Sequence, residues 1–275
     1  MKTQSYTSTY SFRRKSEKYW LKNESINSLF WEFTKNKKSS STPKWMGNIF
    51  QNHTLSCSAL ISDACYLFLS MGLPTATIHL AKYLVRKKTK LKGIFGPTAE
   101  VESFLKEWEK LNPNIHTSFD KSFYIFESLN KRCFPADHTS LITATDKEWP
   151  RVSLWAKAFA AESSPKLDPY KSVQLAKDML KKGCLYLCKD KKGQTKGMGG
   201  FGRHTPNSLV INMIYVNPDD RGKGIGEALV RNMIDSVRMH GYRRCLLFSD
   251  YLKSDNLYRK MGLKEIGILI EKSIS

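Results

Sequence analysis

The sequence lacks the cysteine patterns that stabilise small secreted domains or hold zinc. Its six cysteines include no C-x-x-C pair and no cluster with histidine at the spacing of a zinc site. Six cysteines in 275 residues are also too few for a disulfide framework, which favours a reducing compartment. We therefore expect free thiols and no metal centre.

Long apolar segments are missing as well. The first 20 residues lack the apolar region of a secretory signal, and their polar, basic composition is typical of a loosely held arm. The most apolar window, residues 57–73, contains Asp63 and is shorter than a membrane-spanning helix. The sequence therefore predicts a soluble, cytoplasmic protein with no membrane partner.

Acidic residues are scarce relative to basic ones. There are 25 Asp and Glu against 45 Lys and Arg, a formal net charge of +20, and the excess is spread along the chain. Spread positive charge suits phosphorylated ligands, nucleic acid or anionic surfaces but selects none of them. The hydrophobic share of 41% is enough for large cores, which excludes global disorder.

What the chain does contain is two α/β patterns in succession. A length of 275 residues fits two domains, and strands and helices alternate through residues 1–144. A capping box from Thr145 to Glu148 then opens a helix with apolar residues at helical spacing. Two helices, an antiparallel meander and a β-loop-α-β unit follow. We expect an α/β domain over residues 1–144 and a second over residues 145–275.

The segment between residues 211 and 231 carries the chemistry. A strand ends at Val216, and a glycine-dense turn leads from it directly into a helix. The glycines at 222, 224 and 226 let consecutive backbone N–H groups point into one concavity, where the unpaired amides and the dipole of the helix start favour an anion. Arg221 and Lys223 flank this turn. The arrangement predicts a diphosphate site.

The spacing excludes two familiar phosphate-binding motifs. The turn contains no G-x-x-x-x-G-K-[ST], so it is not a P-loop. It reads R-G-K-G-I-G and follows a meander late in the chain, unlike the G-x-G-x-x-G first turn of a Rossmann domain. On the motif alone, an ordinary flexible strand-helix turn is the structural alternative.

On these residues the sequence resembles the GNAT superfamily of N-acetyltransferases. The family's acetyl-CoA motif is Arg or Gln, two residues, Gly, one residue, then Gly or Ala, which Arg221, Gly224 and Gly226 satisfy. The resemblance covers about residues 145–270 and includes a short helix with a Tyr-x-x-x-Gly pattern. It implies a mixed, mainly antiparallel sheet flanked by helices. Residues 1–144 resemble the degenerate GNAT-like half of two-domain relatives, with an unrelated α/β domain as the alternative.

The resemblance also implies how acetyl-CoA, the acyl donor, is held. Its pyrophosphate lies on the turn amides and its pantetheine arm pairs with the preceding strand, whose amides polarise the thioester carbonyl. Asn256 stands one place after the position of the family's asparagine. The residues assigned to cofactor binding are Met213, Ile214, Tyr215, Val216, Arg221, Gly222, Lys223, Gly224, Ile225, Gly226, Glu227 and Asn256.

Two residues are the catalytic candidates. Tyr258 occupies the place of the family's tyrosine near the departing sulfur, where a phenol protonates the thiolate; a packing tyrosine is the alternative interpretation. Glu162, at the end of a predicted helix, is the best remaining acid to accept the proton of the amine. A solvated carboxylate is the alternative interpretation of Glu162.

The leading hypothesis is an acetyl-CoA-dependent N-acetyltransferase acting on an amine that the sequence does not identify. The alternative is a catalytically idle GNAT-fold protein that binds nucleic acid or protein through basic runs at residues 13–15, 35–38 and 86–88. Such runs are more typical of solvated helix ends and loops, because no aromatic-basic RNA motif accompanies them. Nucleic acid is therefore a partner that the sequence permits without favouring.

Overall fold

The computed structural model describes residues 1–35, 42–128, 139–163, 166–249 and 256–275. Their contacts divide the chain into two compact units: unit 1 is Met1–Ile125 with Ile266–Ser275, and unit 2 is Phe126–Glu265. This division lies upstream of the boundary we expected after residue 144. The strand at residues 139–143, just before the expected boundary, lies entirely in unit 2. Most of the last strand of the chain belongs to unit 1.

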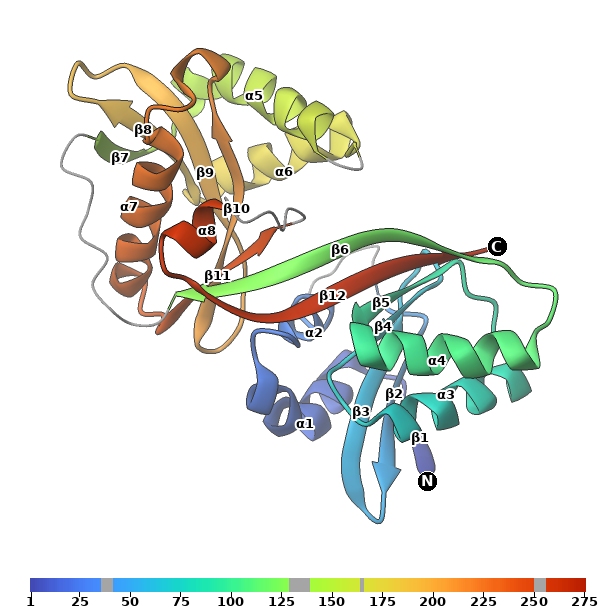
Figure 1. Cartoon of the computed structure of the whole chain (residues 1–275). Helices are drawn as coiled ribbons and strands as arrows, with labels where there is room; N and C mark the ends of the chain where they lie inside the picture. Colours follow the sequence, from blue (N-terminus) through green and yellow to red (C-terminus); the bar gives the residue numbers. More distant parts are fainter. Residues whose placement is uncertain (36–41, 129–138, 164–165, 250–255) are drawn as a thin grey trace. The chain divides into compact units, whose positions relative to one another are not determined.

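Unit 1 is a sheet with helices on both faces (Figure 1). Its strand order is β1-β2-β3-β4-β5-β12. The strands β1 to β4 pair antiparallel in sequence, β4 pairs parallel with β5, and β12 pairs antiparallel with β5. The elements are β1 (Lys2–Tyr6), α1 (Thr9–Trp20), η1 (Leu21–Asn23), α2 (Ser28–Phe33), β2 (Trp45–Gln51), β3 (Thr54–Ile61), β4 (Tyr66–Leu69), α3 (Pro74–Arg86), β5 (Gly93–Pro97), α4 (Thr98–Leu111), the first part of β6 (Thr117–Ser128) and most of β12 (Lys264–Ile274).

Two separate cores lie on the two faces of this sheet. Along β3, Leu60 packs in an aromatic cluster with α1 and α2, whereas its neighbour Ile61 packs in the core beneath α3 and α4. Successive side chains of a strand point to opposite faces, so the two helix pairs cover opposite sides. Phe12 and Trp20 of α1 are fully buried in the aromatic cluster.

The burial of α1 corrects our expectation for residues 1–20. This segment is not a loose arm but forms β1 and α1, which are part of the first sheet and of its aromatic core. Composition misled the prediction because most of the polar and basic residues of α1 face solvent, while its few large aromatics supply the packing. The buried face of α1 consists of three residues spaced four apart, Phe12, Ser16 and Trp20.

Unit 2 is also a sheet between helices. Its strand order is β11-β10-β9-β8-β7, with the end of β6 beside β11. The strands β7 to β10 pair antiparallel in sequence, and β10 pairs parallel with β11. The elements are β7 (Thr139–Thr143), η2 (Asp146–Glu148), α5 (Trp149–Glu162), α6 (Pro169–Lys181), β8 (Leu185–Asp190), β9 (Thr195–His204), β10 (Ser208–Val216), η3 (Pro218–Asp220), α7 (Ile225–Met239), β11 (Arg244–Ser249) and α8 (Leu257–Lys260).

Neighbouring glycines in β9 let helices approach both faces of the unit 2 sheet. A Cβ on Gly199 would meet the Met233 sulfur of α7 at 2.7 Å, and a Cβ on Gly200 would meet the Met179 sulfur of α6 at 2.5 Å. Because adjacent residues of a strand face opposite ways, α7 lies on one face and α6 on the other. A side chain at either position would force the methionine that packs on it to move.

The two units repeat one order of elements. In each, two helices follow the first strand, four strands pair antiparallel, and a helix connects the fourth strand to a fifth strand parallel to it. That connecting helix is α3 in unit 1 and α7 in unit 2. The structure therefore confirms the expected fold class, a GNAT-type mixed sheet in the second half and a GNAT-like α/β copy in the first.

Candidate active site

A distortion in β10 marks the start of the candidate site. Met213 has a positive φ of 56°, and the pairing of β10 with β9 shifts register between Asn212 and Tyr215. The Asn212 side chain supports this bulge by accepting a hydrogen bond from the Met213 amide (2.7 Å). Positive φ is unusual for methionine, and bulges of this kind bend a strand and redirect its pairing.

Beyond the bulge, β10 and β11 follow different courses. Their parallel pairing joins Ser208–Val210 to Arg244–Leu246, at the start of both strands. β10 then continues through the bulge to Val216, along the four residues predicted to pair with the pantetheine arm. A strand segment that has left its ladder presents backbone donors and acceptors to an extended ligand.

The glycine turn leads from β10 to the N-terminus of α7. Gly222 and Gly224 have φ of 73° and 76°, and a Cβ added to either would meet nothing within 4 Å. The helix ladder starts with the hydrogen bond from the Ala228 amide to the Gly224 carbonyl (3.0 Å), so the amides of residues 222–227 precede it. Open space at these glycines, amides that precede the helix ladder and the positive end of α7 together fit a diphosphate.

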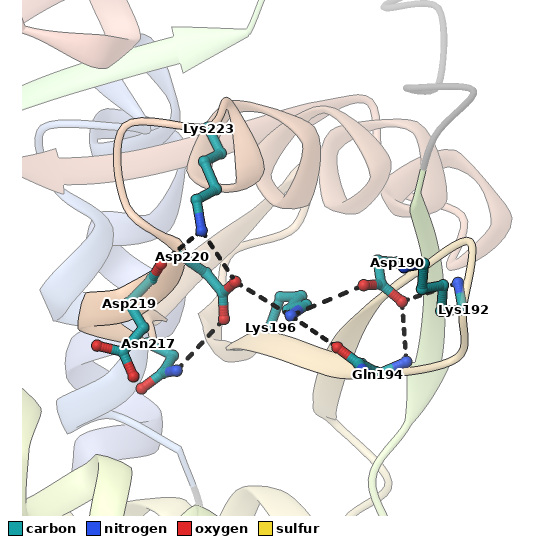
Figure 2. Close-up of polar contacts among 8 residues, drawn as sticks. All are labelled: Asp190, Lys192, Gln194, Lys196, Asn217, Asp219, Asp220 and Lys223. Atoms are coloured by element: carbon teal, nitrogen blue, oxygen red, sulfur yellow. Dashed lines mark hydrogen bonds and ion pairs between the residues drawn. The ribbon is translucent and has the colours of Figure 1, made fainter.

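An ion-pair network fixes the base of this turn (Figure 2). Asp220 is buried, and its Oδ1 lies 3.1 Å from the Lys196 Nζ of β9 and 3.7 Å from the Lys223 Nζ. Lys196 also lies 3.7 Å from Asp190, and the Asn217 amide donates to Asp220 Oδ2 (3.3 Å). The network joins the β8–β9 turn, the start of β9 and the glycine turn.

Hydrogen bonding keeps both central groups of the network charged. The bond from Lys196 holds the pKa of Asp220 below its usual range, and the same contact raises the pKa of Lys196. The sequence analysis did not identify these two residues, because nothing in the local pattern around Lys196 indicates a partner in the turn after β10. The two residues meet only because the meander brings the start of β9 beside the end of β10.

The Arg221 side chain joins Glu162 to the end of β10. Its Nη2 donates to both carboxylate oxygens of Glu162 (2.8 and 3.1 Å), and its Nε donates to the Val216 carbonyl (3.0 Å). The guanidinium also lies over the Tyr215 ring, 5.3 Å from the centroid. Two predicted site residues, Glu162 and Arg221, are therefore direct partners, although they are far apart in sequence.

The Tyr215 hydroxyl completes this cluster. It donates to Glu162 Oε1 at 3.4 Å. Burial, together with the charge of Glu162, raises the pKa of Tyr215. Lys223, the other predicted flanking cation, donates to the Asp219 carbonyl (2.6 Å) and so braces its own turn. Both flanking cations thus have protein partners.

The tyrosine candidate lies on the short helix α8. The Tyr258 ring packs against Phe126 with centroids 5.5 Å apart. Asn256, which is 3% exposed, caps α8 by accepting hydrogen bonds from the amides of Tyr258 (2.9 Å) and Arg259 (3.3 Å), and its own amide donates to Ser249 (3.3 Å). The side chain we assigned to the pantetheine arm therefore orients the helix that carries Tyr258.

Two further observations bear on the sequence predictions. In the described part of the chain, no helix is both long and apolar enough to cross a membrane. Among the same residues, His, Cys, Asp and Glu side chains do not gather in threes as a metal ion would require.

Comparison with known proteins identifies the second half of the chain. Residues 128–263 match the family described as the acetyltransferase (GNAT) family, a span that contains the bulged strand, the glycine turn and α8. None of the curated proteins matches this sequence.

Solved structures extend the likeness to the whole chain. A GCN5-related N-acetyltransferase from Sphaerobacter thermophilus matches with a TM-score of 0.62 at 11% identity, covering 99% of this chain and 95% of that chain. A GNAT-family acetyltransferase from Colwellia psychrerythraea matches with a TM-score of 0.57 at 14% identity, covering 100% and 99%. A tandem GNAT protein from the clavulanic acid biosynthesis pathway matches with a TM-score of 0.55 at 10% identity, covering 100% and 98%.

At such identities the likeness shows the fold, and the tandem protein agrees with two GNAT-like halves. The family match itself covers unit 2 almost completely. Residues 128–263 of this chain therefore belong to the GNAT acetyltransferase family.

Proposed function

We propose that this protein is an N-acetyltransferase that uses acetyl-CoA, with its active site in unit 2. One observation carries the proposal: the open glycine turn at the start of α7 directly follows a bulged strand that has left its parallel partner. The turn suits the diphosphate of an acyl-CoA, and the strand suits an extended arm. Family membership of residues 128–263 supports acyl transfer in general.

In this proposal the backbone of unit 2 binds and orients the donor. The amides of residues 222–227 hold the phosphate oxygens, and the backbone of Met213–Val216 pairs with the arm and polarises the thioester carbonyl. Bound acetyl-CoA supplies an acetyl group already activated as a thioester. The Asp220–Lys196 contact keeps the turn in its open form.

Tyr258 and Glu162 are the proposed proton-transfer groups. The Tyr258 hydroxyl gives a proton to the departing thiolate. The Glu162 carboxylate takes one from the acceptor amine through water: its side chain is 46% exposed, and Oε2 accepts only the Arg221 hydrogen bond among the described contacts. Arg221 positions this carboxylate beside the end of β10.

The test compares two glycines that share a backbone conformation but differ in place. Gly224 (φ 76°) lies in the proposed turn, and Gly193 (φ 74°) lies in the β8–β9 turn, with open space at both Cβ positions. Gly224→Val and Gly193→Val therefore carry equal backbone strain. We expect calorimetry to show one acetyl-CoA bound per wild-type chain, at least tenfold weaker binding in Gly224→Val, about 1.4 kcal/mol, and unchanged binding in Gly193→Val.

Other outcomes would contradict the proposal in distinct ways. Equal affinity in both variants, with native circular dichroism, would remove the diphosphate from the glycine turn. Absence of acetyl-CoA binding in the wild type, combined with RNA or DNA binding that weakens steeply with salt, would favour the binding-module alternative.

A further inference from the structure

Unit 1 contains a cavity that the proposed acyl transfer does not use. Its volume is about 560 Å³, within the usual range of small-molecule sites. It lies where β2 begins, β3 ends and α3 ends. The loop equivalent to the unit 2 glycine turn precedes α3, so the cavity is at the other end of that helix. The lining includes Ser5, Lys44, Trp45, Cys65, Tyr83, Lys87 and Lys90.

Two aromatic rings form a pre-arranged wall of this cavity. The rings of Trp45 and Tyr83 lie with centroids 6.0 Å apart. Ser5 fixes both, because its hydroxyl accepts a hydrogen bond from the Trp45 indole (3.0 Å) and lies 3.1 Å from the Tyr83 hydroxyl. A Cβ on Gly47 would meet the indole ring at 2.4 Å, so this glycine makes room for it. A wall held in this way loses little conformational entropy when a planar group binds.

Positive charge surrounds the aromatic wall. Lys44, Lys87 and Lys90 are exposed residues of the lining, and among the described lining residues none is Asp or Glu. The positive electrostatic field around the wall extends along α3. The pKa of His79 on this helix is lowered, first by burial and then by the positive charges of the N-terminus, Arg86 and Lys82. Lysine side chains bind phosphate as point charges. Because the described rim residues include no carboxylates, these lysines can bind an anionic ligand.

Cys65 gives the cavity a chemical reporter. It lies in the β3–β4 turn, and the Lys44 Nζ donates to its sulfur at 3.1 Å. It is partly exposed, whereas Cys57, Cys188 and Cys245 are buried. Cys184, in unit 2, is partly exposed as well and lies outside the cavity. A molecule seated between the lysines therefore shields Cys65 and leaves Cys184 unchanged.

From the aromatic wall, the lysine rim and the volume, we propose that this cavity binds a small organic phosphate with a planar aromatic body, of the mononucleotide class. The phosphate contacts Lys44, Lys87 and Lys90, and the ring lies against Trp45 and Tyr83. This site is separate from the proposed acyl-CoA site, and its existence does not depend on that function.

The experiment measures alkylation of Cys65 by iodoacetamide in the full chain, followed by peptide mass spectrometry, with Cys184 as internal control. We expect saturating AMP to slow alkylation of Cys65 at least fivefold and that of Cys184 not at all. Adenosine and inorganic phosphate, each carrying half of the proposed chemistry, should protect far less. In calorimetry, AMP should bind at least tenfold more weakly to the double variant Lys87→Ala/Lys90→Ala.

A matched control removes the same charge elsewhere. Lys106 and Lys110 are exposed on α4 and outside the cavity, so Lys106→Ala/Lys110→Ala should bind AMP as the wild type does. Equal weakening in both double variants would reduce the effect to net charge and overturn the proposal. Unchanged AMP affinity in Lys87→Ala/Lys90→Ala, or protection of Cys65 by inorganic phosphate as strong as by AMP, would overturn it too.

Discussion

In unit 1 the backbone amides of the loop between β4 and α3 donate to protein acceptors, whereas in unit 2 two glycines of the corresponding turn, between β10 and α7, border open space. The unit 1 loop has three consecutive amides with protein acceptors: Met71 donates to Asn27 (2.9 Å), Gly72 to the Glu100 carboxylate (2.8 Å), and Leu73 to the Ser56 carbonyl (3.0 Å). In unit 2 the amides of residues 222–227 precede the helix ladder, and a Cβ on Gly222 or Gly224 would meet nothing within 4 Å.

The difference shows that the same topology can have two different roles. In unit 1 the buried side chain of Glu100 accepts the hydrogen bond of the Gly72 amide, whereas in unit 2 the corresponding turn has open space at Gly222 and Gly224. A Cβ on Gly72 would meet the Ser56 carbonyl oxygen at 2.4 Å, while a Cβ on Gly222 would meet nothing within 4 Å. The same turn therefore stabilises the fold in one unit and forms a candidate ligand site in the other.

The largest expected effect comes from adding a methyl group to the filled loop. Gly72→Ala pushes a Cβ into backbone that cannot move cheaply, so we expect the free energy of unfolding to fall by about 3 kcal/mol. Gly222→Ala in the open turn meets no atom and should cost only the strain of its positive φ, about 1–2 kcal/mol. Urea denaturation of both variants measures the gap; equal losses would mean that the two turns do not differ in packing.

The region after the fifth strand offers a second contrast, since α4 follows β5 directly, while α8 with Tyr258 follows β11. Tyr258→Phe keeps the ring on Phe126 but removes the hydroxyl that we propose as the proton donor to the thiolate. We expect kcat for transfer to an identified amine to fall ten- to a hundredfold, up to about 2.7 kcal/mol, with acetyl-CoA affinity retained.

Free-thiol release and calorimetry together separate the roles of Tyr258. An unchanged rate would make this tyrosine a packing residue. A loss of affinity in parallel with the rate would instead assign the hydroxyl to cofactor binding. Only a slower reaction with normal binding agrees with the general-acid role.

The two turns should also respond differently to acid. The pKa of Asp220 is lowered by its bond from Lys196, so its contribution to stability is present above the unfolded-state pKa of about 3.9 and is lost as pH falls through the lower folded-state value. We expect Asp220→Asn to lower the thermal midpoint at pH 7 and to differ less from wild type near pH 3. Asp219→Asn, at the exposed neighbour, is the control and should show no such convergence.

Glu100 should give the smallest effect, with the opposite sign. Burial raises the pKa of Glu100, so the folded chain holds its proton over a range where the unfolded chain has lost it, and stability falls as pH rises from about 4.3 through the folded-state pKa. Glu100→Gln keeps an oxygen for the Gly72 amide and removes the charge. We expect a gain below about 1 kcal/mol at pH 8 in urea denaturation and none at pH 4; a loss at pH 8 would contradict the buried-charge interpretation.

Local patterns predicted the parts of unit 2 that local residues determine. The capping box is present, with the Thr145 amide and hydroxyl both donating to Glu148 (2.9 and 2.6 Å). The strand expected to end at Val216 is β10, Ser208–Val216, and the helix expected directly after the glycine turn is α7, Ile225–Met239. Apolar periodicity, glycines and caps are short-range signals, which is why these elements could be located from the sequence.

Features that depend on distant partners could not be predicted. The bulge at Met213 has no sequence signal, because methionine rarely adopts a positive φ. The partnership of Glu162 with Arg221 depends on the meander placing α5 beside the end of β10. The last strand, β12, extends to Ile274 through pairing with β5, which lies far back in the sequence.

The return of β12 to unit 1 sets an order of events during protein synthesis. Leu269–Ser273 pair with Gly93–Pro97, and the amides of His116 and Ser275 exchange hydrogen bonds with each other's carbonyls (2.8 and 2.9 Å). The ribosome makes these residues after all of unit 2, so the first sheet waits with the β5 edge unpaired until unit 2 has been made. An unpaired edge is open to wrong partners. The nascent chain is therefore most exposed to misassembly in its first half, although that half is made first.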